Sequence, residues 1–357
     1  MSTLPLSTLE RAVLPLDAAR SRVMRVAVGT RLGVFLVGRR DRRVAAQAAC
    51  GVLFTFLLVM FAPAVMLAVG PVVFGVPHVA SDVRYLVLRR GVSRPAITLT
   101  LVFAGLVTAV RGLGLVVPHG LPWAAIEMGL LCAWVAAAAL AGASASGRRE
   151  LRVPVVLLAL GAAFLVVPRA LGTGVVLAHA HNVVAIAVWL FVFRRNVRAA
   201  TVPLLFAAVA VLVLLSGATL PVSMPHGTAL GVSLAESASW MAPGFSVRAG
   251  AAIVLSFAFL QSMHYAVWLG WIPQEDVRAE GTLSFKMSLR SMMRDFGSRG
   301  LGVCAALTLI VVAGACFALT RTRELYLSFA VFHGYLEIAM LAYFLCAHRA
   351  SPSAETR

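Results

Sequence analysis

Charged residues are scarce in this chain, and acidic residues are the scarcest. Of its 357 residues, 31 are lysine or arginine and 14 are aspartate or glutamate, so charged side chains make up 13%. Soluble domains carry about 25% charged residues. Apolar residues reach 61%, and the mean hydropathy is +0.92. The composition therefore excludes an ordinary soluble domain and predicts a membrane protein.

Cysteine and lysine are also rare. The five cysteines form no Cys-x-x-Cys pair, so neither a disulfide framework nor a thiolate-bound metal or iron–sulfur cluster is expected. The only lysine in the sequence, Lys286, lies outside the apolar runs. A retinal Schiff base inside a membrane is therefore excluded.

Long apolar runs recur along the chain, each sufficient to cross a hydrocarbon layer of about 30 Å. We expect ten membrane-spanning helices, at residues 45–69, 71–88, 95–116, 121–142, 153–170, 172–193, 201–220, 249–271, 300–320 and 325–347. The predicted fold is an all-α, polytopic integral membrane bundle over residues 45–347. A basic segment, residues 1–44, precedes it and could form an interfacial helix. A short tail, residues 348–357, follows it.

The net charge of +17 is distributed unevenly among the connections. Arginine clusters at residues 39–43, 89–94, 148–152 and 194–198 adjoin alternate span ends, and the opposite connections hold few basic residues. This is the positive-inside pattern, which predicts cytoplasmic termini in a multi-pass protein of the inner (plasma) membrane. The lipid bilayer explains the basicity, so nucleic acid is not an expected partner.

Two connections are long, and one span contains breaking residues. Residues 221–248 are expected to contain a short interfacial helix or a lid over a cavity, and residues 285–296 a basic surface helix on anionic headgroups. Gly75 and Pro77 are predicted to interrupt the second span just before His78.

Histidines inside the apolar runs are the strongest indication of function. An ionisable side chain in the hydrocarbon layer is costly unless it is paired, solvated or metal-bound. Counting along the spans places most of these histidines roughly 12–15 Å below one membrane boundary, with His264 deeper. The candidate metal ligands are His78, His179, His181, His264 and His333.

Two of these histidines have a carboxylate one helical turn later. Asp82 follows His78 and Glu337 follows His333 by four residues, so each pair shares a helix face. Asp82 and Glu337 are the candidate catalytic carboxylates, because each could complete the metal's ligands or orient an imidazole. Pairing of Asp82 with Arg84 or Arg89 is the structural alternative. Arg111 and Glu127 are expected to pair with each other.

The choice between His179 and His181 stays open. Their rings point about 200° apart on a regular helix, so one of them faces a common centre. His181 is favoured slightly, because Asn182 and Ala185 continue a small polar stripe. The imidazole and carboxylate donors suit non-haem Fe(II) best, and bis-histidine haem b remains an alternative.

The segment Phe74-Gly-Val-Pro-His78-Val-Ala-Ser-Asp82 resembles the Gly-hydrophobic-Pro-His-Gly-Ala-x-Asp motif of the bacteriorhodopsin-related (Brp/Blh-like) membrane carotenoid dioxygenases. His78 and Asp82 match that motif, and His181, His264 and His333 are looser counterparts of the family's later histidines. Val79 replaces its usual glycine, and the histidines clustered near its C-terminus are absent here. The resemblance implies a helical membrane protein that cleaves a carotenoid with histidine-held iron and O₂.

We therefore expect an iron-dependent, dioxygenase-like oxidoreductase acting on an apolar small molecule such as a carotenoid or lipid. A haem b electron-transfer protein, a proton- or metal-coupled transporter and a purely structural role for the histidines are the alternatives.

Overall fold

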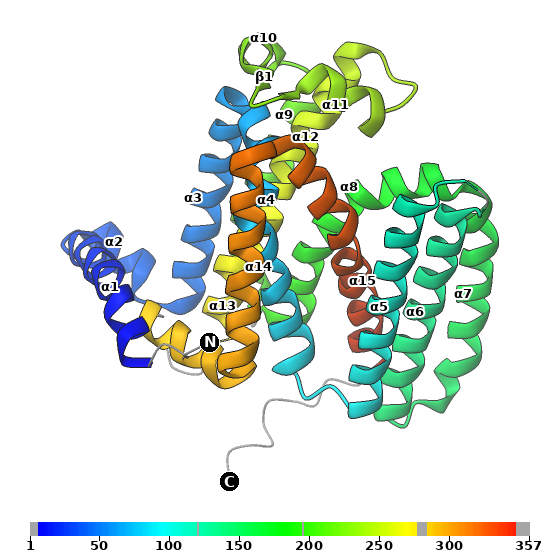
Figure 1. The fold of residues 1–357 in the computed structure, drawn as a ribbon. Coiled ribbons are helices and arrows are strands. Elements are labelled where there is room, and N and C mark those ends of the chain that lie inside the picture. The colour runs from blue at the N-terminus through cyan, green and yellow to red at the C-terminus, as the bar shows by residue number, and fades with distance from the viewer. Residues whose placement is uncertain (1–5, 120, 195, 277–283, 348–357) are drawn as a thin grey trace. The chain divides into compact units, whose positions relative to one another are not determined.

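The computed structural model describes residues 6–119, 121–194, 196–276 and 284–347, and the side chains among them from Glu10 onward. The described chain is almost entirely helical (Figure 1). Its one sheet is a two-stranded hairpin of β1, Thr228–Ala229, and β2, Val232–Ser233. Eight helices in these residues are long and apolar enough to cross a membrane. The all-α membrane class is therefore confirmed. The predicted tail at 348–357 lies outside the described residues.

The first of two compact units comprises residues Met1–Arg84 and Trp189–Thr322. Its larger helices are α1, Leu6–Val28; α2, Arg31–Val37; α3, Arg40–Phe61; α4, Pro63–Asp82; α9, Thr201–Leu215; α11, Leu234–Met241; α12, Val247–Ala266; and α14, Phe285–Ala330, up to Thr322. The shorter elements are η4, Trp189–Phe193; η5, Val197–Ala200; α10, Leu220–Ser223; η6, Met224–His226; η7, Val267–Trp271; and α13, Ile272–Glu275.

Helix α12 forms the centre of the first unit. It packs against α3, α4 and α9, and 13 of its 20 residues are buried. Its core side chains include Leu255, Phe259 and Met263, each at most 1% exposed. A helix enclosed on nearly all sides can hold polar side chains away from both lipid and water, which is the setting of His264.

The second unit comprises residues Tyr85–Val188 and Arg323–Arg357. Its helices are α5, Arg94–Val116; α6, Trp123–Ala145; α7, Arg152–Val166; α8, Ala170–Val188; and α15, Phe332–Cys346, with short turns η2, Arg149–Leu151, and η3, Val167–Arg169. The π-helical turn η1, Val83–Leu88, begins at the end of the first unit.

Helices α6 and α15 pack so closely that their backbones are in contact. A Cβ added at Gly142 of α6 would lie 2.3 Å from the carbonyl oxygen of Tyr343 in α15, a separation that no side chain tolerates. Ser146 donates a hydrogen bond to the carbonyl oxygen of Cys346 at the same contact, over 3.0 Å. Small residues allow such close approach in membrane helices.

Two helical runs exceed the length of one crossing. Arg149–Phe193 contains 45 residues and Phe285–Cys346 contains 62. At 1.5 Å per residue they would extend about 65 Å and 90 Å, against a hydrocarbon core of about 30 Å. Within α14 the backbone leaves the helical conformation at Gly297 and Ala318.

The helical part of two local predictions is confirmed, and one prediction is wrong. Residues 285–296 are helical up to the break at Gly297, and the long connection at 221–248 contains the short helix α11. Gly75 and Pro77 do not interrupt the second span, because α4 continues through both residues to Asp82. The irregularity follows instead as the π-helical turn η1.

Candidate metal centre

His78 projects from α4 with its ring orientation set by its own helix. Its Nδ1 lies 2.9 Å from the carbonyl oxygen of Phe74, one turn earlier. A carbonyl oxygen accepts only, so Nδ1 carries the proton and donates it. The other nitrogen, Nε2, then holds the lone pair that a metal ligand needs.

His264 of α12 meets His78 within the first unit. Both histidines are 1% exposed, their ring centroids are 5.1 Å apart, and the rings lie at 77°. Tyr265 contacts the His78 ring at a centroid distance of 4.8 Å. Two imidazoles bound to one ion place their centroids about 4.5–5.2 Å apart, given a metal–nitrogen bond of about 2.1 Å and angles of about 90–110°. The observed spacing fits this arrangement.

Asp82 lies one turn beyond His78 and is completely buried. Neither of its carboxylate oxygens has a hydrogen-bond partner among the described residues. The expected alternative partner Arg84 bonds Asp295, with Nε 2.7 Å from Oδ2, and Ser291. A buried carboxylate without a partner is costly, and a nearby cation would offset that cost. Asp82 therefore suits a metal site as a ligand.

The second unit holds a matching pair of histidines. His181 of α8 and His333 of α15 have ring centroids 5.5 Å apart at 82°. Nδ1 of His181 lies 3.3 Å from the carbonyl oxygen of Leu177, and Nδ1 of His333 contacts the carbonyl oxygen of Ala330. As in His78, the contact with a carbonyl oxygen places the proton on Nδ1 and leaves the lone pair on Nε2 in both His181 and His333.

The remaining candidates in the second unit are Glu337 and His179. Glu337, one turn after His333, is completely buried, so each unit contains a histidine pair and a buried carboxylate on the same helix as one of them. His179 is half-buried on α8. It is His181 whose ring lies against His333.

A polar cluster joins α5, α6 and α15 in the second unit. The predicted Arg111–Glu127 pair is present, with Arg111 Nε 2.6 Å from Glu127 Oε2. Tyr335 donates a hydrogen bond to Glu127 Oε1 over 2.5 Å. A sequence pattern could not identify this third member, because Tyr335 is 208 residues from Glu127. Arg111 neutralises the charge of Glu127, so the Glu127 carboxylate has a structural role.

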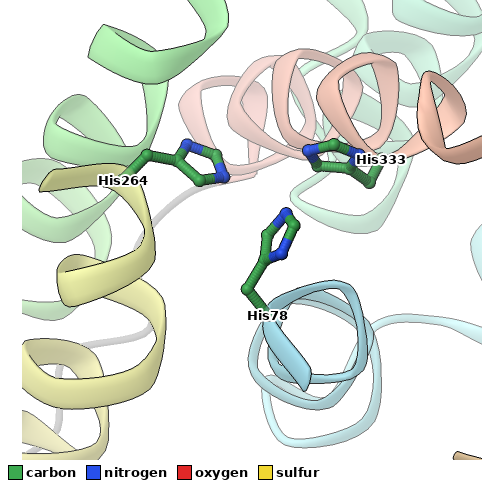
Figure 2. Close-up of side chains that lie close together, drawn as sticks. All are labelled: His78, His264 and His333. Carbon is green, nitrogen blue, oxygen red and sulfur yellow. The ribbon is translucent and has the colours of Figure 1, made fainter. Parts of the chain in front are cut away.

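Three of the candidate ligands are drawn in Figure 2: His78 from α4, His264 from α12 and His333 from α15. All are buried, and no thiolate is among them. Imidazole nitrogens are common ligands of zinc, copper, iron and nickel.

Comparison with protein-family models, with curated proteins and with solved structures finds no match for this chain.

Proposed function

We propose that this protein is a membrane-embedded, histidine-ligated metal oxygenase that uses non-haem Fe(II) and O₂ on an apolar substrate. The observation that carries the proposal is the pair of buried imidazoles, His78 and His264, with the buried carboxylate of Asp82 one turn away. Two histidines and one carboxylate are the donor set of many non-haem Fe(II) oxygenases.

In the proposed site, His78 and His264 of the first unit hold one metal ion. His181 and His333 of the second unit form a second possible ligand pair. Asp82 and Glu337, each in its own unit, would complete the ligands or accept hydrogen bonds from them. The alternative arrangement is one ion in each unit, because each unit has its own histidine pair and carboxylate.

The ligand geometry within each unit supports non-haem iron over haem b. Two axial histidines on opposite sides of a haem iron place their ring centroids about 6.3 Å apart, given metal–nitrogen bonds of about 2.0 Å. The observed pairs are 5.1 Å and 5.5 Å apart. Both values are too short for opposite ligands, and the 5.1 Å of His78 and His264 fits adjacent ones.

Residues of the chain would perform three tasks in this activity. The carbonyl oxygens of Phe74 and Ala330 orient the imidazoles of His78 and His333. The ring of Tyr265, which lies against both histidines, would help to exclude water from the pair. An apolar substrate would reach the site laterally from the bilayer. Bound ferrous iron would supply the activation of O₂.

The topology and the family resemblance are parts of the same proposal. The helical runs of 45 and 62 residues would each contain two crossings, which yields ten spans with both termini in the cytoplasm of a plasma-membrane protein. The motif around His78 and Asp82 supports a relation to the Brp/Blh-like carotenoid dioxygenases, and hence β-carotene as the first substrate to test.

The test is metal analysis and a visible spectrum of protein purified in mild detergent without chelators, followed by O₂ uptake with β-carotene. We expect about one iron per chain, no Soret band and substrate-dependent O₂ consumption. A Soret band would assign the protein to the haem class. Absence of any metal after reconstitution with Fe(II) would overturn the proposal in favour of a transporter or a structural role.

A further inference from the structure

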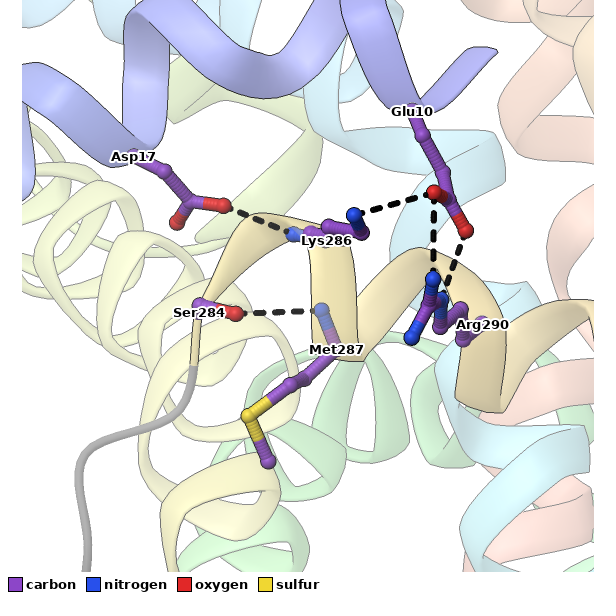
Figure 3. Close-up of polar contacts among 6 residues, drawn as sticks. All are labelled: Glu10, Asp17, Ser284, Lys286, Met287 and Arg290. Atoms are coloured by element: carbon purple, nitrogen blue, oxygen red, sulfur yellow. Dashed lines mark hydrogen bonds and ion pairs between the residues drawn. The ribbon is translucent and has the colours of Figure 1, made fainter. Parts of the chain in front are cut away.

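Helix α1 is attached to the beginning of α14 by a set of polar contacts, the α1–α14 latch, shown in Figure 3. Asp17 accepts hydrogen bonds from the backbone N–H groups of Phe285 and Lys286, over 2.8 and 3.0 Å. Ser284 accepts one from Met287 over 3.1 Å. These contacts satisfy the first N–H groups of α14, which have no partner within the helix.

Glu10 supplies the other half of the α1–α14 latch. Its carboxylate lies 2.6 Å from Nε of Arg290 and 3.1 Å from Nζ of Lys286. The hydrogen bond from Arg290 is the main reason why the pKa of Glu10 falls below its ordinary value of 4.5. The latch therefore employs both acidic residues of the segment from residue 6 to residue 40.

The lowered pKa of Glu10 makes the latch sensitive to acid. A carboxylate with a depressed pKa stabilises the folded contact above its ordinary pKa, and the contribution disappears as the pH falls through the depressed value. We expect amide hydrogen exchange in α1, corrected for intrinsic rates, to be constant from pH 8 to pH 5 and faster below about pH 4. Glu10→Gln should raise exchange at pH 7 by about twofold to fivefold, whereas the exposed Glu324→Gln should not. Wild-type exchange that stays constant down to pH 3 would contradict the latch.

Away from the latch, α1 presents an apolar stripe. Ala12, Leu16, Ala19, Val23 and Val26 are spaced 4-3-4-3 along the helix, so they share one face. All five are exposed, and the three larger side chains, Leu16, Val23 and Val26, are 50%, 68% and 75% exposed. The half-buried residues Val13, Asp17, Arg20, Met24 and Ala27 repeat the same spacing on the latch side.

An arginine stripe adjoins the apolar one. Arg11, Arg22 and Arg25 are exposed and lie within about 60° of one another around the helix axis. Helix α2 continues the pattern with exposed Arg31 and with Leu32, 67% exposed. Because the carboxylates of Glu10 and Asp17 both contact α14, the opposite, exposed face of α1 combines positive charge with apolar side chains.

We propose that the arginine stripe and the apolar stripe of α1, continued by α2, bind the anionic phospholipid leaflet beside the beginning of α3. Charge complementarity selects anionic headgroups, and the adjoining apolar side chains would enter the boundary of the acyl chains. Chain connectivity adds a second reason. Helix α2 ends at Val37 and the apolar span α3 begins at Arg40, so the α1–α2 segment is tethered at a membrane surface.

The test uses the full-length protein in nanodiscs of phosphatidylcholine alone and with about one-third phosphatidylglycerol. We expect amide exchange over residues 10–25 to be at least about tenfold slower with the anionic lipid, because each arginine near an anionic surface contributes about fivefold. The triple variant Arg11→Gln, Arg22→Gln and Arg25→Gln should lose most of this slowing. Val23→Gln with Val26→Gln should also reduce it, because the apolar stripe holds the arginines at headgroup depth.

A matched triple variant controls for charge. Arg169→Gln, Arg248→Gln and Arg321→Gln remove the same charge from exposed positions on other elements and should preserve the slowing. Equal exchange in both lipids, or full slowing in the α1 triple variant, would overturn the proposal. Protection that appears only in discs containing two copies of the chain would assign the stripes to self-association instead.

Discussion

Changing His78 to alanine is expected to lower bound iron to below about one-tenth of the wild-type content, and His264→Ala should do the same. The two rings meet within one compact unit at a spacing suited to a shared ion. Loss of a residue that only orients a ligand typically costs 10–100-fold in metal affinity, so loss of a ligand should cost at least as much. The measurement is iron per chain after purification without chelators, with circular dichroism to establish that the variants fold.

His226→Ala is the matched control, because His226 is exposed in the connection between α9 and α11. It should retain the wild-type iron content. His333→Ala tests whether the second unit binds an ion of its own. A single ion at His78 and His264 predicts wild-type iron content, whereas one ion in each unit predicts a decrease from two ions to one. Wild-type iron content in both the His78 and the His264 variants would contradict a site at this pair.

A large loss of stability is expected when Glu275 is replaced by alanine. Glu275 and Arg194 form an ion pair in which both side chains are completely buried, and Arg194 also donates to the carbonyl oxygen of Asp41 over 3.2 Å. Removing the carboxylate leaves a buried guanidinium without its counter-charge, which costs about 3–5 kcal/mol. Thermal unfolding in detergent, followed by circular dichroism, should show a clear decrease in the midpoint.

The double variant Glu275→Ala with Arg194→Met should be more stable than Glu275→Ala alone, because it removes the uncompensated charge. Glu150→Ala is the control, since Glu150 is 67% exposed and its pair with Arg148 is at the surface. It should change stability by less than about 1 kcal/mol. If Glu275→Ala melted like wild type, the buried pair would not contribute to stability as described.

Only part of the candidate site could be predicted from the sequence. Spacing of four residues identified Asp82 with His78 and Glu337 with His333, because both pairs are neighbours on one helix. That the ring of His181 lies against His333 depends on how α8 and α15 pack. The bonds from Nδ1 to carbonyl oxygens, which leave the lone pair on Nε2, depend on side-chain torsions that no sequence pattern specifies.

Local composition and periodicity alone determined the helical membrane class, the approximate helix positions and the burial of ionisable residues in apolar runs. These properties depend on neighbours within a few turns of helix, which the sequence contains directly. Tertiary structure decided which polar side chains pair with each other. Arg84 bonds Asp295, 211 residues later, instead of Asp82, and Tyr335 donates a hydrogen bond to Glu127. It also decided which face of α1 turns to α14 and which stays exposed. Such choices depend on packing between distant segments, where several pairings satisfy the same local pattern.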